Sequence, residues 1–353
     1  MRVALCDPSA FTPQYDHELA EALGRAGLDV ELLTSHFRFG EIPAAAAYMR
    51  HEIFYPASPR IFRRSFLRLP VKAVEHPVGM ARLTRWRADV VHLQWLAWPQ
   101  LDRHLLRLRS PSVFTAHDLL PRRSSSQRGL WLELFGRFDR IVVHSHRGRA
   151  ALGELGVAEE RLRVIPHPVF ASDPRRADDG RTLLCLGVIR PYKGLGDAIA
   201  AVKQLDGARL LVAGDPVEPV EAYRAAAGAT AEWRLGYLPD SELDRALGEA
   251  TVALFPYRAE IDQSGALLRA LGAGVPAVVY DIGGLAEPVR AFGAGRVVPA
   301  GDVAGLAAAA AELLGDAQAL EEARAGARRA RADLTWDSAA EAHLAVYREV
   351  VER

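Results

Sequence analysis

The chain has 353 residues, of which 50% are hydrophobic and 25% charged, and its basic and acidic residues balance at 44 each. This composition excludes a disordered protein, and the length is sufficient for two domains. Basic residues are in excess in 1–168 and acidic residues in 169–353, which indicates two bodies with different roles.

The two cysteines, Cys6 and Cys185, lie far apart in apolar runs, so they build neither a disulfide framework nor a zinc cluster. The first residues contain too short an apolar stretch for a signal peptide, and no run is long enough to span a bilayer. We therefore expect a cytoplasmic protein.

Short β-branched runs alternate with longer helical patterns along the chain, which predicts parallel α/β sheets. In the first part we expect a helix at 15–26 and strands at 3–6, 29–34, 90–93, 112–115, 140–144 and 162–165. In the second part we expect helices at 196–205, 240–250, 264–273 and 303–314, and strands at 183–187, 209–213, 232–235, 252–255, 276–280 and 295–298. The predicted fold class is α/β with two doubly wound sheets, joined at the proline-rich stretch 166–174.

Ligands of open α/β sheets bind beyond the carboxyl ends of the strands, so the polar residues that follow strands are the candidates for function. Arg190 and Lys193 lie three residues apart in a Pro/Gly-shaped loop after strand 183–187. Two cations on such a loop before a helix suit a diphosphate. The alternative is a solvated loop with two surface charges.

Two further loops follow strands. After strand 252–255, Ser264 can cap the next helix, Gly265 lets a ligand approach its first N–H groups, and Asp262 can accept hydrogen bonds from hydroxyl groups. An ordinary N-cap explains Ser264 equally well. After strand 276–280, paired glycines precede Glu287, which either faces the same ligand or follows a simple turn.

These stretches, in this order, resemble the GT4 family of retaining glycosyltransferases. The resemblance covers roughly residues 180–300 and rests on Gly187-Val-Ile-Arg-Pro-Tyr-Lys-Gly, Val212-Ala-Gly-Asp, Gly236-Tyr-Leu-Pro-Asp-Ser-Glu-Leu, Phe255-Pro-Tyr, Ser264-Gly-Ala-Leu-Leu, Ala273-Gly-Val-Pro-Ala-Val-Val and Gly283-Gly-Leu-Ala-Glu. It implies the GT-B fold, in which two Rossmann-like domains face a central cleft. The implied domains are an acceptor-binding domain, 1–168, to which the terminal helix 335–353 crosses back, and a donor-binding domain, 169–334.

By this resemblance, Arg190 and Lys193 hold the diphosphate of a nucleoside diphosphate sugar. The other implied donor-binding residues are Gly236, Leu238, Asp262, Ser264, Gly265, Ala266 and Glu287. The family usually has two glutamates eight positions apart, but Ile261 and Arg269 occupy these positions here. The usual Gly-Gly loop after the first strand is also absent, and residues 7–16 stand in its place.

His117, in Phe114-Thr-Ala-His-Asp-Leu-Leu-Pro121, resembles the cleft histidine of the family, and His144 ends the next strand. The alternative for each is a structural histidine. We reject a metal site because no Asp or Glu completes the pair. The implied catalytic residues are therefore His117, Arg190 and Lys193.

The implied activity is metal-independent, retaining transfer of a sugar to a glycan or lipid-linked acceptor, in envelope glycan, exopolysaccharide or glycolipid synthesis. The alternatives are a degenerate sugar-nucleotide-binding protein and a GT-B epimerase. No Gly-x-Gly-x-x-Gly follows the first strand, which argues against a dinucleotide oxidoreductase. We expect no nucleic-acid partner. Residues 59–87 interleave eight basic residues with aromatic and leucine side chains, which suits peripheral contact with the inner face of a membrane or, alternatively, a solvated helix.

Overall fold

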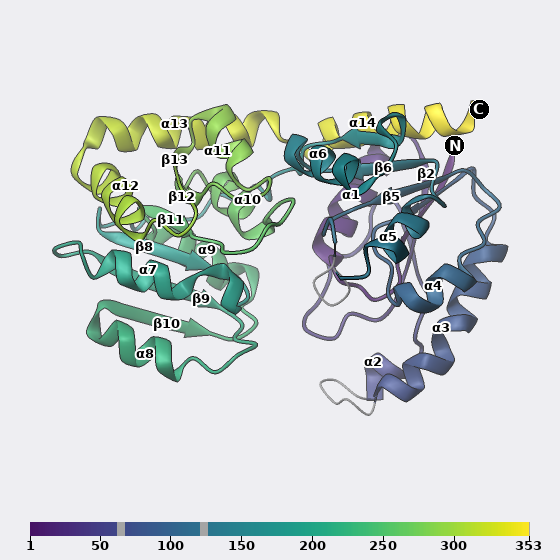
Figure 1. Ribbon diagram of the computed structural model, residues 1–353, viewed down its shortest axis with the longest axis horizontal. Helices are drawn as coiled ribbons and strands as arrows, with labels where there is room; N and C mark the ends of the chain where they lie inside the picture. Colours follow the sequence, from purple (N-terminus) through teal and green to yellow (C-terminus); the bar gives the residue numbers. More distant parts are fainter. Residues whose placement is uncertain (62–67, 121–125, 353) are drawn as a thin grey trace. The chain divides into compact units, whose positions relative to one another are not determined.

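The computed structural model describes residues 1–61, 68–120 and 126–352, and it divides into two compact units (Figure 1). Unit 1 comprises Met1–Pro166 and Trp336–Arg353, and unit 2 comprises His167–Thr335. The sequence-based boundaries were after residues 168 and 334. Both units contain a wholly parallel sheet with helices on its two faces, as the alternation of strand and helix patterns predicts.

The sheet of unit 1 has seven strands in the order β3-β2-β1-β4-β5-β6-β7. The strands are β1 (Arg2–Asp7), β2 (Asp29–Thr34), β3 (Met49–Glu52), β4 (Val90–Leu93), β5 (Ser112–Thr115), β6 (Arg140–Val143) and β7 (Leu162–Val164). The helices are α1 (Pro13–Arg25), α2 (Ser58–Ile61), α3 (Arg68–Arg85), α4 (Pro99–Leu105), α5 (Arg128–Phe135), α6 (His146–Leu155) and α14 (Trp336–Val351).

Alternate residues of these strands enter cores on opposite faces of the sheet. Cys6, Leu93 and Val143 belong to the cluster that includes side chains of α3, α5 and α6. On the other face, the Nδ1 atom of His92 lies 2.7 Å from the hydroxyl of Tyr347 on α14. The last helix of the chain therefore completes the core of unit 1.

The sheet of unit 2 has six strands in the order β10-β9-β8-β11-β12-β13. The strands are β8 (Thr182–Leu186), β9 (Arg209–Gly214), β10 (Ala231–Leu235), β11 (Val252–Phe255), β12 (Ala277–Tyr280) and β13 (Gly295–Val298). The helices are α7 (Leu195–Val202), α8 (Glu221–Ala227), α9 (Asp240–Glu249), α10 (Gly265–Gly272), α11 (Ala286–Phe292), α12 (Val303–Gly315) and α13 (Ala317–Asp333).

Two buried clusters sandwich this sheet. Leu184, Phe255 and Val279 point to the face that carries α9, α10 and α11. Leu183 and Leu254 point to the face that carries α7 and α12. This alternation explains why the strands read as continuous apolar runs in the sequence, because both of their faces are buried.

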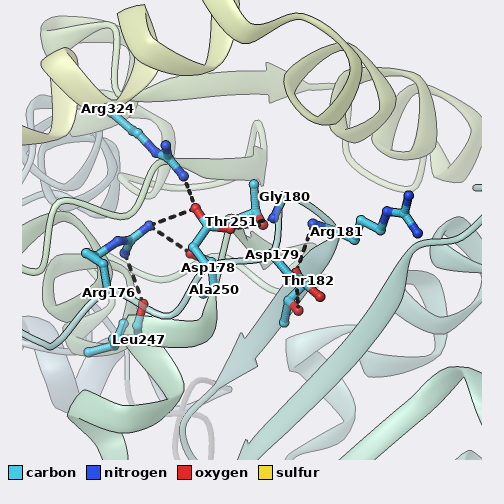
Figure 2. A network of polar contacts seen from close by, with 10 residues as sticks. All are labelled: Arg176, Asp178, Asp179, Gly180, Arg181, Thr182, Leu247, Ala250, Thr251 and Arg324. Atoms are coloured by element: carbon cyan, nitrogen blue, oxygen red, sulfur yellow. Dashed lines mark hydrogen bonds and ion pairs between the residues drawn. The ribbon is translucent and has the colours of Figure 1, made fainter.

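The segment that leads into β8 is fastened by one carboxylate (Figure 2). Asp178 accepts hydrogen bonds from the N–H of Gly180 and the hydroxyl of Thr251, and it pairs with Arg176 and Arg324. Burial alone would raise the pKa of Asp178, but these hydrogen bonds and the two guanidinium groups hold it below its ordinary value. The charged carboxylate therefore ties this segment to the helices of unit 2.

Within the described residues, no single helix is long and apolar enough to cross a membrane. Helices α12 and α13 satisfy the length and composition criteria only as a pair, and the pair is bent by 100°.

Candidate active site

Three neighbouring strands of unit 2 end at glycines whose φ is positive. These are Gly187 after β8 (101°), Gly214 at the end of β9 (154°) and Gly236 after β10 (132°). A Cβ on Gly214 would lie 1.9 Å from the carbonyl oxygen of Gly187, so the two backbones pack as closely as glycine permits. A Cβ on Gly236 would meet nothing within 4 Å. This edge of the sheet therefore presents backbone to a ligand with few side chains in the way.

Lys193 reaches back over the end of β8. A side chain on Gly187 would come within 3.2 Å of Lys193 Nζ and 3.3 Å of the Cβ of Ala266, and Nζ lies 5.0 Å from the centroid of the Tyr257 ring. Lys193 is half-buried, whereas Arg190 is exposed at the start of the same loop. The structure thus brings Lys193, rather than Arg190, to the first turn of α10.

The first turn of α10 adjoins the Lys193 ammonium group. Ser264 is the N-cap residue: its Oγ accepts from the N–H of Leu267 (3.4 Å) and lies 3.0 Å from the hydroxyl of Tyr257. Gly265 and Ala266 follow as the first helical residues, and both are half-buried. A helix N-terminus beside a cation is an electropositive site that suits a phosphate group.

The loops after β11 and β12 pack directly on each other. The N–H of Gly284 donates to the carbonyl of Ile261 (3.0 Å), and Gln263 Nε2 donates to the carbonyl of Gly284 (2.9 Å). Gly283 has a φ of 52°, and a Cβ there would lie 2.1 Å from the Ile261 carbonyl oxygen. A side chain on Gly283 would therefore prevent this close approach. The same turn leads into α11, whose first turn contains the half-buried Glu287.

In unit 1, His117 lies at the carboxyl end of β5 among aromatic rings. Its ring stacks on Trp95 with a centroid separation of 5.2 Å and meets the edge of Tyr15 at 4.7 Å. Its Nε2 lies 2.8 Å from Gln94 Oε1, and its Nδ1 lies 3.3 Å from His144 Nε2. His117 is half-buried, so its position is fixed by the protein while part of its surface remains accessible.

His144 orients His117 and is itself buried. Burial lowers the pKa of His144 to about 4, so the ring is neutral near pH 7. Its Nδ1 lies 3.0 Å from the carbonyl oxygen of Ile165 and donates to it, which leaves Nε2 as an acceptor. His117 Nδ1–H then donates to His144. On the other side of the ring, Gln94 presents its Oε1 atom to His117 Nε2.

Comparison with known proteins assigns the chain to a family. Residues 14–172 match the model described as Glycosyltransferase Family 4, and residues 180–316 match the model described as Glycosyl transferases group 1. The chain belongs to the GT4 family of glycosyltransferases. The family inferred from the sequence is thereby confirmed.

Individual GT4 relatives resemble this chain to different extents. It is 30% identical to a glycogen synthase of Mycobacterium tuberculosis, over 82% of this chain and 66% of that protein, and so spans just under two thirds of that relative. It is 27% identical to a phosphatidyl-myo-inositol mannosyltransferase of Mycobacterium leprae, over 99% of this chain and 97% of that protein. The structure of Anabaena HepE with UDP-glucose has a TM-score of 0.70 at 14% identity, covering 100% of this chain and 98% of that chain. These similarities confirm the GT-B fold.

The first position of the GT4 glutamate pair, Ile261, is flanked by two carboxylates in different environments. Asp262 is fully buried, whereas Glu260 is exposed. We predicted that this pair of carboxylates, with Asp262 as the donor-binding residue, accepts from sugar hydroxyls; the structure exposes Glu260, and the role of Asp262 stays a prediction. Which of the two side chains is exposed depends on how the loop packs, and this packing is not evident from the sequence.

The second position of the pair, Arg269, forms part of a cluster with three other residues. Its guanidinium pairs with Asp240 (3.2 Å) and lies 5.2 Å from the centroid of the Phe170 ring. Tyr237 is 47% exposed next to this pair, and the Leu238 side chain packs on the core. In the Gly236-Tyr-Leu segment that we predicted to border the base, Tyr237 is the more exposed side chain, and the donor-binding role of Leu238 stays a prediction.

A turn organised by Asp7 replaces the usual Gly-Gly loop of GT4 proteins. The Asp7 carboxylate accepts hydrogen bonds from the N–H groups of Ser9, Phe11 and Thr12. Ala10, within the turn, has a φ of 49°. Burial and the Asp7 carboxylate raise the pKa of the neighbouring Asp16 well above its ordinary value. A buried acidic pair thus shapes the loop where glycines usually do.

A cavity of about 540 Å³ lies at the opposite edge of the unit 1 sheet, lined by Arg2, Asp29, Trp86, Asp89 and Arg109 among others. These residues begin or precede strands, so the cavity is separate from the candidate site, because α/β sheets bind ligands at the carboxyl ends of their strands. In 1–61, 68–120 and 126–352, no group of three or more His, Cys, Asp or Glu side chains is arranged to hold a metal ion.

Proposed function

We propose that this protein is a retaining glycosyltransferase that moves a sugar from a nucleoside diphosphate sugar to an acceptor hydroxyl. The observation that carries this proposal is the placement of Lys193 against Gly187 and Ala266, at the glycine-lined edge of unit 2. A cation, a helix N-terminus and exposed backbone together suit a diphosphate. Family membership and the HepE structure with UDP-glucose support this choice of donor.

The difficult step of the reaction is cleavage of the bond between the sugar carbon C1 and the diphosphate oxygen. Negative charge develops on the leaving diphosphate, and Lys193 with the first N–H groups of α10 would stabilise it. Arg190 is exposed in the same loop and would add to this stabilisation if its side chain turned toward the phosphates. Glu260, which is exposed on the loop after β11, would accept hydrogen bonds from hydroxyl groups of the donor sugar.

His117 would orient the donor sugar or the acceptor rather than serve as a general base. Its ring is held between Trp95 and Tyr15, and its Nδ1 is engaged by His144. The leaving phosphate would take the proton of the acceptor hydroxyl, as the resemblance to retaining enzymes implies. We further propose that the reaction requires no metal ion. Activity that is lost with EDTA and restored by magnesium or manganese would contradict this.

A thermal-shift screen with UDP, GDP, ADP and TDP tests the donor site. A nucleotide present at 100 times its dissociation constant should stabilise the protein by about 2.7 kcal/mol. Nucleotide release from the matching sugar nucleotide then tests catalysis. If none of the four diphosphates shifts the melting temperature, the proposed donor site is wrong.

The Arg269 cluster supports a second candidate function, that of a sugar-nucleotide-binding protein without turnover. Arg269 lies where the family usually has a carboxylate, so this position carries the opposite charge, and Asp240 pairs with it. Tight nucleotide binding combined with no release of nucleotide from any sugar nucleotide would favour this second function. Slow hydrolysis without acceptor would favour the transferase.

We also propose a glycan or lipid-linked acceptor, with peripheral membrane contact through 59–87. Residues 62–67 of this segment lie outside the described part of the chain. On α3, the side chains of Leu69, Val74 and Val78 are 52%, 73% and 52% exposed, and Arg82 and Arg85 are exposed further along. Exposed apolar side chains near cations suit an anionic membrane surface. The mannosyltransferase relative, whose name specifies a phosphatidylinositol acceptor, supports this choice.

Sedimentation with vesicles of phosphatidylglycerol and phosphatidylcholine tests the membrane contact. We expect the protein to sediment with the vesicles at low salt and to be released at high salt, since each cation near the headgroups contributes about 1 kcal/mol. The variant Val74→Ser with Val78→Ser should sediment less. If the wild type stays in the supernatant at low salt, a soluble acceptor becomes the better proposal.

A further inference from the structure

A buried chain of hydrogen bonds in unit 1 has no role in the function proposed above. His76 on α3 is wholly buried; its Nε2 lies 2.6 Å from Asp102 Oδ1, and its Nδ1 lies 2.6 Å from the Tyr55 hydroxyl. Asp102, on α4, also accepts from the N–H of Trp98 (2.9 Å). Tyr55 and Asp102 are 2% and 1% exposed. We call Tyr55, His76 and Asp102 the Tyr–His–Asp chain.

The chemistry of these groups fixes the direction of each hydrogen bond. A carboxylate only accepts, so His76 Nε2 donates to Asp102 Oδ1, and Nδ1 is then placed to accept from the group on the other side of the ring. The Tyr55 hydroxyl therefore donates to His76. Burial raises the pKa of Tyr55 and keeps this hydroxyl protonated, and the Ser9 side chain forms a hydrogen bond with it in turn. Each group of this series therefore donates its hydrogen to the next group in the direction of Asp102.

Ser9 is the half-buried end of this series. Lys72 Nζ donates to Ser9 Oγ over 2.9 Å and lies 4.4 Å from the centroid of the Tyr55 ring. A serine hydroxyl has one hydrogen and two lone pairs. Among the described residues, Ser9 donates to Tyr55 and accepts from Lys72, which leaves one lone pair of its hydroxyl for a ligand. A ligand hydroxyl fits this lone pair, since it can donate a hydrogen bond, whereas a carboxylate or a fully ionised phosphate cannot.

Backbone strain lies on both sides of the contact between Ser9 and Tyr55. Ala10 (φ 49°) and Tyr55 (φ 46°) are the non-glycine residues with positive φ in the part of the chain that the structure describes. Such conformations are strained for residues with a Cβ and persist where the surroundings enforce them. Here Glu75 accepts from the N–H of Ala57 (2.7 Å), two residues beyond Tyr55. The two strained residues therefore lie where the hydroxyl groups of Ser9 and Tyr55 meet.

Aromatic rings adjoin this end of the series. Phe11, two residues after Ser9, is 54% exposed, and its ring centroid lies 5.4 Å from that of Trp95. Trp95 stacks on His117, so Ser9 belongs to the same carboxyl edge of the unit 1 sheet. Sugars and polyols present hydroxyl donors together with C–H surfaces, which suit an accepting oxygen beside aromatic rings.

We propose that Ser9 accepts a hydrogen bond from a hydroxyl group of a neutral sugar or polyol acceptor. The Tyr–His–Asp chain consists of positioning residues, which hold the Ser9 hydroxyl in the orientation that accepts. This inference rests on the proposed function. It adds to that function a residue that binds the acceptor, Ser9, and the chemical class of acceptor that Ser9 binds.

The test measures nucleotide release from UDP-glucose, GDP-mannose and ADP-glucose, alone and with methyl α-glucoside, methyl α-mannoside or sorbitol. We expect at least one of these neutral compounds to stimulate release by the wild type. Ser9→Ala should raise its half-saturating concentration about tenfold, the equivalent of one hydrogen bond. Tyr55→Phe should act in the same direction, and Ser9→Thr should restore the wild-type value. Basal release without acceptor should not change in any variant.

Tyr48→Phe is the matched control. The Tyr48 hydroxyl lies 3.0 Å from His17 Nδ1, so it makes another buried tyrosine–histidine hydrogen bond, but Tyr48 precedes β3 whereas Tyr55 follows it. Half-saturation should be unchanged in this variant.

The inference would be overturned by unchanged half-saturation in Ser9→Ala, by equal effects of Tyr48→Phe and Tyr55→Phe, or by a parallel fall in basal release. Stimulation of the wild type by glucose 6-phosphate and by none of the neutral compounds would contradict it as well. Release that no neutral compound stimulates also overturns it, while the proposed donor chemistry stands. Absence of basal release from all three sugar nucleotides would instead contradict the proposed function, and this inference would fall with it.

Discussion

The carboxyl edges of the two sheets differ: glycine backbone forms much of the edge in unit 2, and side chains form it in unit 1. In unit 2 the strands β8, β9 and β10 end at glycines, and Lys193 lies over exposed backbone. In unit 1 the corresponding edge carries the side chains of Trp95 and His117, which fix one another by ring contacts. Backbone and a cation can hold the phosphates that all nucleotide sugars share, whereas side chains recognise one particular molecule. We therefore expect damage to unit 2 to stop the reaction and damage to unit 1 to change its acceptor.

The largest effect should come from Lys193. Lys193→Met keeps much of the aliphatic stem but removes the ammonium group, so we expect the turnover number to fall by about 10²-fold or more. Arg190→Ala should have a smaller effect, because Arg190 is exposed. Lys203→Met is the matched control, since this exposed lysine donates to the carbonyl of Ala226. Wild-type turnover in Lys193→Met would show that the diphosphate does not bind at this loop.

The second prediction concerns the stability of unit 2. Asp178→Ala removes the acceptor of two hydrogen bonds and leaves two guanidinium groups without their partner, so we expect a loss of about 3 kcal/mol in unfolding free energy. Urea denaturation measures this loss in unfolding free energy. Asp281→Ala is the control, because the pair of Asp281 with Arg290 is half exposed and should contribute under about 1 kcal/mol. Equal losses in the two variants would show that Asp178 has no special role.

The third prediction concerns the helix that completes unit 1. Tyr347→Phe removes the hydroxyl that bonds the buried His92 Nδ1, so we expect a loss of about 1–3 kcal/mol. Tyr223→Phe is the control, since its hydroxyl bonds Glu218 over 3.3 Å in a half-buried place. If Tyr347→Phe unfolds at the wild-type urea concentration, α14 is not coupled to the sheet through this contact.

The smallest effect is a pH dependence. Burial lowers the pKa of His343 to about 4, below its unfolded value of about 6.5, so its contribution to stability is complete above pH 6.5 and is lost as the pH falls toward 4. His343→Leu should therefore lose less stability than the wild type between pH 7 and pH 5, by at most about 2 kcal/mol. Asp16 contributes with the opposite sign, because burial raises its pKa, but it is present in both proteins. Equal losses in both proteins would refute the assignment.

Most strands were predictable because both of their faces are buried, which produces continuous apolar runs. The strands β2, β4, β5, β11 and β13 match the predicted ranges to the residue. The strand β3 was missed because Met-Arg-His-Glu has no apolar alternation; it pairs only at the edge, with β2. The helix α13 was missed because its buried face consists of small residues, Ala319, Ala323, Gly326, Ala327 and Ala330, and lacks a periodic stripe of large apolar side chains.

The site was predictable to the level of loops, but not always to that of individual side chains. The turn residues around Lys193 at the end of a strand were sufficient to select it. The choice between Glu260 and Asp262 depends on how one loop packs on another. The Tyr–His–Asp chain left no signal at all, because its members come from separate segments of the sequence and meet only when α3 and α4 pack.

The return of α14 to unit 1 has a consequence for how the protein is made. Asp337 pairs with Arg25 of α1, and Tyr347 reaches His92 of β4, so residues 336–351 finish a core whose other parts precede unit 2 in the sequence. A ribosome releases the sheet of unit 1 first, with the face that α14 covers still open to water. Unit 2 follows as one continuous segment and can fold during translation. The domain that is synthesised first therefore matures last, and a chaperone that shields its open apolar face has the whole translation time of unit 2 in which to act.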